Sequence, residues 1–209
     1  MAGERGVSDS SRFGRFLSPW LTLRQAREAL RAGLPDDARR LLAPLVADGY
    51  RKAIRLMREV ARSYALRGER ALRADNAGAA WKELLAAEAL NTGDETAIRL
   101  RQTLVRLGLA ECRAALEAGN PLHVVDTAAR LVDRNAGGAE LDVLLSAAQD
   151  WLLAADQADR GEFLLAADTL GRAKKSLDGP VVAGIEKFAD QLCARHERFR
   201  DALGRVDDA

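Results

Sequence analysis

The sequence predicts an all-α protein built from repeated helical hairpins. Four turn residues are followed, five positions later, by a small apolar residue, and the turns are separated by 42, 44 and 42 residues. The pairs are Gly33 with Ala38, Asp75 with Ala80, Gly119 with Val124, and Gly161 with Ala166. Such a period is typical of helical-hairpin arrays, and no alternating β-rich run competes with it. We therefore expect a right-handed α-solenoid of about four antiparallel helix hairpins plus a C-terminal capping helix.

The first residues are expected to form a flexible arm over 1–17, because they are rich in Ser, Gly and charge. Within the arm, residues 12–17 alternate basic and aromatic side chains. One interpretation is a linear docking motif. The other is an arm that places Phe16 and Trp20 over the first hairpin.

The first hairpin is expected to begin at Ser18. Ser18 can cap a helix, and Pro19 is tolerated at the first helical position. This helix should end near Ala32, and a second helix should begin at Asp37. Pro44 should bend or end that second helix, because proline lacks an amide donor and clashes with the preceding turn.

The second hairpin has a long helix over about 50–74, a turn at 75–78, and a shorter helix carrying Trp81 and Leu84. Apolar residues of the long helix recur at spacings of 3, 4 and 3, which predicts one buried stripe. The stripe consists of Ile54, Met57, Ala61 and Tyr64.

The rest of the chain follows the same plan. The expected helices cover about 95–118, 121–134, 139–160 and 162–177, and a last helix follows Pro180. A capping box at Thr92–Glu95 and an Asn120 cap start two of them. The last helix should cover the open end of the array, because terminal repeats need a polar outer face. One repeat domain over 18–204 and a tail over 205–209 are expected.

The second half of each unit resembles the tetratricopeptide repeat, in which small and bulky residues alternate on the face between two helices. The matching sets are Asp75, Ala80, Leu84 and Ala87; Gly161, Ala166, Leu170 and Ala173; and, in part, Gly33, Ala38 and Leu42. The units here are longer than the 34 residues of that family, and the third unit has Val124 and Ala128 at the key positions. The resemblance implies a scaffold whose concave face binds a peptide or a partner helix, often as one module of a larger protein.

The composition and motifs argue against catalysis. Both cysteines, Cys112 and Cys193, are expected to be small core residues, and His123 and His196 are expected at the surface or at a helix cap. The sequence contains no phosphate-binding glycine loop, zinc-type cysteine pair or nucleophile motif. We therefore predict no enzyme activity, no catalytic residue, no metal and no cofactor.

The sequence also bears on location. It has no run of about 18 apolar residues that could span a membrane, and its N-terminus lacks the apolar segment of a secretory signal. A cytoplasmic protein without membrane contact is expected.

Arginines form the one candidate binding surface. Arg51, Arg55, Arg58 and Arg62 repeat at spacings of 4, 3 and 4, which places them within about 60° on one helix face. Guanidinium groups in this pattern can bind carboxylates or phosphates in a bidentate manner. Alternatively, they form a solvated face whose arginines pair with acids on a neighbouring helix. The chain prefers Arg to Lys throughout, 27 against 5, which also favours this second interpretation.

The leading functional hypothesis is a non-catalytic scaffold or adaptor that binds another protein or peptide. The alternatives are binding of nucleic acid or another polyanion through the arginine stripe, and a regulatory subunit of an enzyme. Nucleic-acid binding is disfavoured by a net charge of only +1 and by the lack of interleaved aromatic residues. Residues 138–168 hold seven acidic side chains against Arg160 alone, so salt-sensitive head-to-tail self-association is a further hypothesis.

Overall fold

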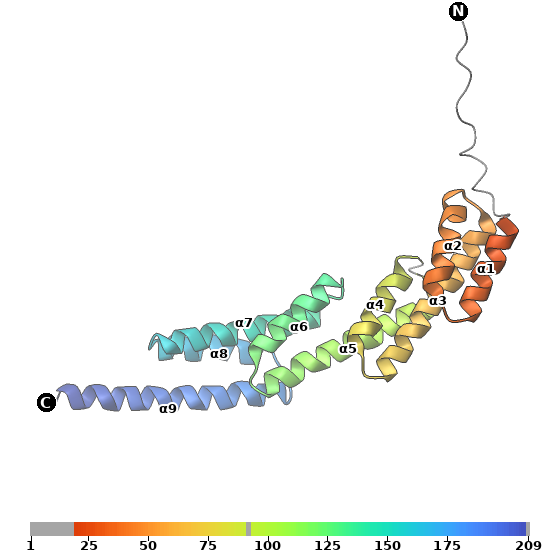
Figure 1. The fold of residues 1–209 in the computed structure, drawn as a ribbon. Coiled ribbons are helices and arrows are strands. Elements are labelled where there is room, and N and C mark those ends of the chain that lie inside the picture. Colours follow the sequence, from red (N-terminus) through yellow and green to blue (C-terminus); the bar gives the residue numbers. More distant parts are fainter. Residues whose placement is uncertain (1–18, 91–92, 208–209) are drawn as a thin grey trace, which may run out of the picture. The chain divides into compact units, whose positions relative to one another are not determined.

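The computed structural model describes residues 19–90 and 93–207, and every regular element in these ranges is an α-helix (Figure 1). The predicted all-α class is confirmed. The helices are α1 (Pro19–Arg31), α2 (Pro35–Ala47), α3 (Arg51–Arg73), α4 (Ala77–Glu88), α5 (Glu95–Glu117), α6 (Pro121–Asp133), α7 (Ala139–Asp159), α8 (Phe163–Lys175) and α9 (Val181–Asp207). The expected arm over 1–17 lies outside the described residues. The tail expected over 205–209 begins later than predicted, because 205–207 still belong to α9, and 208–209 lie outside the described residues.

The four predicted turn residues all end a helix in the same way. Gly33, Asp75, Gly119 and Gly161 have φ values of 74°, 58°, 79° and 83°, the left-handed region. After each of them, the next residue donates its N–H to a carbonyl five residues back, as Leu34 does to Ala29 at 2.9 Å. This Schellman geometry satisfies carbonyls at the helix end and reverses the chain. The repeated turn is therefore confirmed at all four positions.

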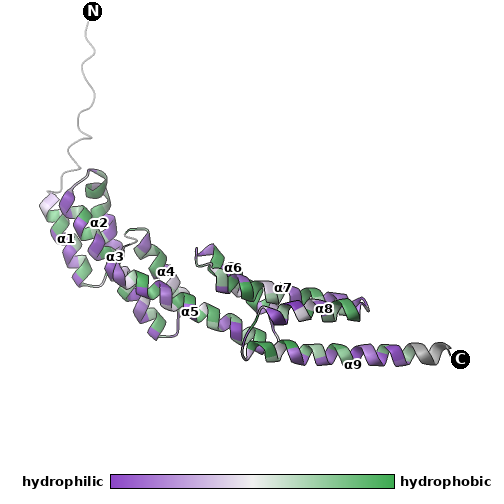
Figure 2. Ribbon diagram, turned by 180° about the vertical axis from the view of Figure 1, so that it is seen from behind, coloured by the Kyte–Doolittle hydropathy of each residue, from purple (hydrophilic) through white to green (hydrophobic). Residues whose placement is uncertain are grey.

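The chain's contacts gather into two compact units, Met1–Gln102 and Thr103–Ala209, whose division falls inside α5. In the first unit α1 packs on α2, α2 on α3, and α3 on α4. In the second unit α6 packs on α7, α7 on α8, and α8 on α9. Hydrophobic and hydrophilic residues are interspersed along the helices (Figure 2).

Small residues let the helices of each hairpin approach closely. The residues five positions after the turns, Ala38, Ala80, Val124 and Ala166, are all 0% exposed. Four positions further on, Leu42, Leu84, Ala128 and Leu170 are also buried. The small and bulky residues that carry the resemblance to tetratricopeptide repeats are thus core residues in this structure, whereas the turn residues Gly33, Asp75 and Gly161 are exposed.

The stripe predicted for α3 needs one correction. Met57, Ala61 and Tyr64 are buried as expected, but Ile54 is 40% exposed. The buried face also contains Ala53, Leu56, Val60, Ala65 and Gly68. Its centre is therefore rotated away from Ile54, because a helix turns 100° per residue.

Two helix boundaries also differ from expectation. Helix α2 begins at Pro35 and continues past Pro44 to Ala47, so Pro44 does not end it. Pro44 lies in the last turn, where its missing N–H costs one hydrogen bond, and its own carbonyl still accepts the N–H of Asp48 at 3.1 Å.

The starts of α5 and α6 are capped by side chains. Thr92 of the predicted capping box lies outside the described residues. Asp94 is the observed cap of α5, since its Oδ1 accepts the N–H groups of Thr96 at 3.0 Å and Ala97 at 3.1 Å. Asn120 caps α6 as predicted by accepting the N–H of His123 at 3.2 Å.

Candidate functional site

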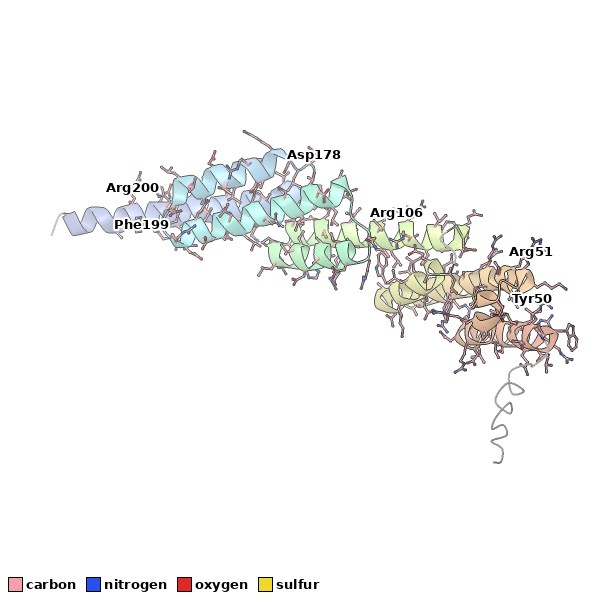
Figure 3. All side chains as sticks on the ribbon, turned by 90° about the horizontal axis from the view of Figure 1, so that it is seen from above. Tyr50, Arg51, Arg106, Asp178, Phe199 and Arg200 are labelled. Atoms are coloured by element: carbon pink, nitrogen blue, oxygen red, sulfur yellow. The ribbon has the colours of Figure 1, made fainter. Side chains whose placement is uncertain are left out.

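The predicted arginine stripe occupies one solvent-facing side of α3. Arg51, Arg55, Arg58 and Arg62 are all exposed, and Arg51 stands at the start of the helix (Figure 3). None of the four forms an ion pair with another described residue. The stripe is thus solvent-exposed, and the described residues show none of the pairing with neighbouring acids that the second interpretation included.

Arg67, on another side of α3, is in contrast paired with acidic side chains. Its Nε lies 2.6 Å from Glu83 Oε2 of α4, and both terminal nitrogens lie 3.0 Å from Asp36 Oδ2 of α2. Tyr64 donates its hydroxyl to Asp36 Oδ1 at 2.7 Å. Arg67 therefore links three helices of the first unit and is committed to the fold.

This cluster makes Asp36 a more acidic group than an ordinary aspartate. The hydrogen bond from Tyr64, followed by the hydrogen bond and charge of Arg67, lowers the pKa of Asp36 despite some opposing desolvation. Burial and the hydrogen bond to Asp36 raise the pKa of Tyr64. The ionised carboxylate is thus the form that the fold favours.

A pH dependence of stability follows from the lowered pKa of Asp36. Its contribution is fully present above the ordinary value of 3.8 and is lost as the pH falls through the lower folded value. We expect Asp36→Asn to be less stable than wild type at pH 7, and the difference to shrink below about pH 3. Urea unfolding at a series of pH values measures this difference. A difference in unfolding free energy between wild type and Asp36→Asn that stays constant down to pH 2 would contradict the lowered pKa of Asp36.

A surface groove of about 920 Å³ lies between the C-terminal end of α1 and the middle of α3. Four arginines line it, Arg27 and Arg31 from α1 and Arg62 and Arg70 from α3. None of these four makes an ion pair with a described residue. The groove is also lined by Leu30, Ala32, Gly33, Glu59, Ser63 and Leu66.

The groove contains only one residue of the predicted stripe. Arg62 is shared, whereas Arg51, Arg55 and Arg58 do not line it. Arg51 lies eleven residues before Arg62, about 16 Å along the helix axis. Sequence reasoning missed Arg27 and Arg31, although their spacing of four residues on one face of α1 was a usable signal.

His123 lies beside a carboxylate that the sequence alone did not bring near it. Its Nε2 is 2.7 Å from Glu111 Oε1, which also accepts hydrogen bonds from Thr127 Oγ1 at 3.2 Å and from Arg130 at 3.3 Å. Glu111 is thereby held by one helix, α6, while it belongs to α5. Such a cluster fastens the two helices together. Among the described residues, no group of three His, Cys, Asp or Glu side chains could hold a metal ion.

The two cysteines differ, which corrects the expectation that both are core residues. Cys112 is buried, but Cys193 is exposed beside a groove between α8 and α9. Burial, with a smaller effect of the Glu111 charge, raises the pKa of the Cys112 thiol to about 11. Cys112 is therefore kept as the protonated thiol, which is unreactive.

Thiol labelling should separate these two residues. At pH 8 a pKa of about 11 leaves about one thousandth of Cys112 as thiolate, and burial blocks the reagent as well. Iodoacetamide is expected to modify one thiol per native chain, at Cys193, and both thiols after denaturation. Intact mass and peptide mapping check this, and equal rates at the two cysteines would contradict it.

The acidic segment over 138–168 is mostly paired within its own unit. Five of its seven carboxylates lie in ion pairs: Glu140 with Arg113, Asp156 and Glu162 with Arg160, Asp159 with Arg195, and Asp168 with Arg172. Asp142 and Asp150 make no ion pair with a described residue. The segment therefore offers a second copy less free charge than its sequence indicates.

Comparisons with family models, with curated proteins and with solved structures find no match for this chain. Within the described ranges, no helix combines the length and the apolar character needed to cross a bilayer.

Proposed function

We propose that this chain is a non-catalytic scaffold or adaptor module that acts in the cytoplasm by binding another protein. In this proposal its hairpins form a right-handed, tetratricopeptide-like α-solenoid of about four hairpins. Helix α9 covers the C-terminal end of the array. The proposal includes the case in which the chain is one module of a larger protein. Support for the array comes from the four identical left-handed helix ends and from the small buried residues that follow each of them.

The observation that carries the binding proposal is the contrast between paired and unpaired arginines in the first unit. The guanidinium of Arg67 forms ion pairs with two carboxylates of the same unit, those of Asp36 and Glu83. The stripe of Arg51, Arg55, Arg58 and Arg62 leaves its guanidinium groups exposed. Exposed guanidinium groups on a rigid helix are pre-organised for carboxylates of a partner, because each offers a planar fork of donors.

A capture experiment with a charge-reversed variant tests this function. The full chain and an Arg51→Glu, Arg55→Glu, Arg58→Glu, Arg62→Glu variant are used as baits in lysate of the native host. A matched control reverses four exposed cations of the second unit: Arg106, Lys187, Arg198 and Arg200. Circular dichroism confirms that each bait is folded.

We expect the control to retain a protein partner that the stripe variant loses. If both variants retain that partner, the stripe is not its binding surface. If both variants lose it, the loss results from the change in net charge and not from the stripe. Nuclease treatment of the lysate separates the second candidate function, polyanion binding, which the same unpaired arginines favour. A partner that disappears with nuclease, and a binding constant that falls steeply with salt, would indicate nucleic acid instead.

Head-to-tail self-association remains a second proposed arrangement, with the arginine surface of one copy meeting the acidic segment of another. The sequence between residues 19 and 102 holds sixteen Arg and Lys against eleven Asp and Glu, so the first unit is basic. Sedimentation at low and high salt tests the arrangement. A sedimentation coefficient that does not depend on salt or concentration would end it.

A further inference from the structure

The groove between α1 and α3 differs from the rest of the arginine surface in having two opposed walls. Arg27 and Arg31 are one turn apart on α1, and Arg62 and Arg70 are about 12 Å apart on α3. A single extended or helical segment lying in the groove can therefore meet guanidinium groups from both sides. Arg51 and Arg55 of the stripe do not line this groove.

The floor of the groove is partly apolar. Leu30 is half-buried and Leu66 is 39% exposed, and both line the groove with Ala32. An aliphatic side chain that enters between the two leucines would remove this apolar surface from water, at about 25 cal/mol per Å². The occupant that fits is amphipathic, with apolar as well as negative groups.

The carboxylate of Glu59 favours a peptide over a continuous polyanion as the occupant of the groove. It lines the same groove and makes no ion pair with a described residue. A nucleic-acid backbone carries a phosphate at every nucleotide and would place negative charge against this carboxylate. A peptide can place its carboxylates at the arginines and a neutral or donor group at Glu59, so the groove favours a peptide.

We propose that this groove binds an acidic segment of a partner protein, in which carboxylates flank a branched aliphatic side chain. The proposal rests on the protein-binding function above and names the chemistry of the partner at one part of that surface. Bidentate contacts from Arg27, Arg31, Arg62 and Arg70 hold the carboxylates, and Leu30 and Leu66 hold the aliphatic side chain. The volume of about 920 Å³ is enough for a segment of a few residues.

Fluorescence anisotropy with synthetic peptides tests the proposal on the full chain. The probe is a labelled peptide in which Glu and Asp alternate with Ser around a central Leu, so that a neutral group is available for Glu59. One comparison peptide replaces every acid by its amide, and another replaces the central Leu by Ser. Two groove variants are measured, Arg27→Gln with Arg31→Gln and Arg62→Gln with Arg70→Gln. The matched control is Lys52→Gln with Lys82→Gln, two exposed cations of the first unit outside both the groove and the stripe, which makes the same charge change.

We expect the acidic peptide to bind and the amide peptide to bind at least tenfold more weakly. Each groove variant should weaken the acidic peptide by at least tenfold and the control by less than threefold, and the Leu-to-Ser peptide should also bind more weakly. All the variants replace exposed cations that make no ion pair with a described residue, so circular dichroism should show each of them folded.

Three results would overturn the proposal: no binding of the acidic peptide, equal loss in the control variant, or displacement of the peptide by a single-stranded oligonucleotide of equal charge. A protein partner captured through the stripe would still support the general function in any of these cases. Conversely, acidic peptide binding in the groove without any captured partner would support this site alone. Failure of the peptide site in the groove can therefore be distinguished from failure of the general protein-binding function.

Discussion

Replacing Gly184 by alanine is expected to detach the first turns of α9 from the C-terminal end of α5. A Cβ at this position would lie 2.2 Å from the carbonyl oxygen of Leu116 and 3.0 Å from that of Glu117. Both atoms belong to backbone, so no side chain can rotate away to relieve the contact. We expect a loss of about 3 kcal/mol in unfolding free energy, the upper part of the range for overpacking.

Hydrogen exchange measures this effect where it arises. Exchange should accelerate in α9, and tryptophan fluorescence should change, because Trp151 lies against Phe188 of α9 at a ring distance of 5.5 Å. Gly171→Ala in α8 is the matched control, since an added Cβ there meets no atom within 4 Å. The control should be neutral or stabilising by up to about 1 kcal/mol, the usual helix preference of Ala over Gly. Equal stability of both variants would show that α9 does not approach α5 so closely.

Leu84→Ala in α4 is expected to cost about 2–5 kcal/mol of unfolding free energy. Leu84 is 0% exposed and follows Ala80 on the face that packs against α3. Truncation leaves a cavity as well as losing apolar burial, and the close packing around Ala80 and Ala87 limits how far the helices can collapse.

The neighbouring Leu85 supplies the control for this substitution. It is 42% exposed on the same helix, so Leu85→Ala changes the same atoms and the same helix propensity with little lost burial. Urea denaturation followed by circular dichroism should show a loss of less than about 1 kcal/mol for Leu85→Ala. A loss below about 0.5 kcal/mol for Leu84→Ala would mean that α4 buries the other face.

The helical hairpins could be predicted because their signals are local. A residue in the left-handed region ends each first helix, and three of the four predicted positions are glycine, which adopts that region without cost. Asp75 at the fourth position has φ 58°, and the period in the sequence identified it although its residue type did not. Spacing therefore carried more information than residue identity.

The errors arose where the outcome depends on neighbouring helices. Periodicity gave a plausible stripe through Ile54, but the position of α2 and α4 around α3 decides which side is covered. Cys193 has a residue type that is usually buried, yet it is exposed at the groove between α8 and α9.

The candidate site was only half predictable for the same reason. The stripe on α3 is a property of one helix and can be read from spacings of 4, 3 and 4. The groove needs Arg27 and Arg31 of α1 to face Arg62 and Arg70 of α3. That juxtaposition depends on the packing of α1 and α2 against α3, which no local pattern reveals.

The most direct test of the central claim is to map where an acidic peptide binds. Amide chemical shifts of the ¹⁵N-labelled full chain are followed while the Leu-centred acidic peptide is added. We predict that the largest shift changes lie in residues 27–33 and 59–70, the two walls of the groove. Changes that centre on the second unit, or that spread evenly over all exposed arginines, would contradict a built binding groove on this surface.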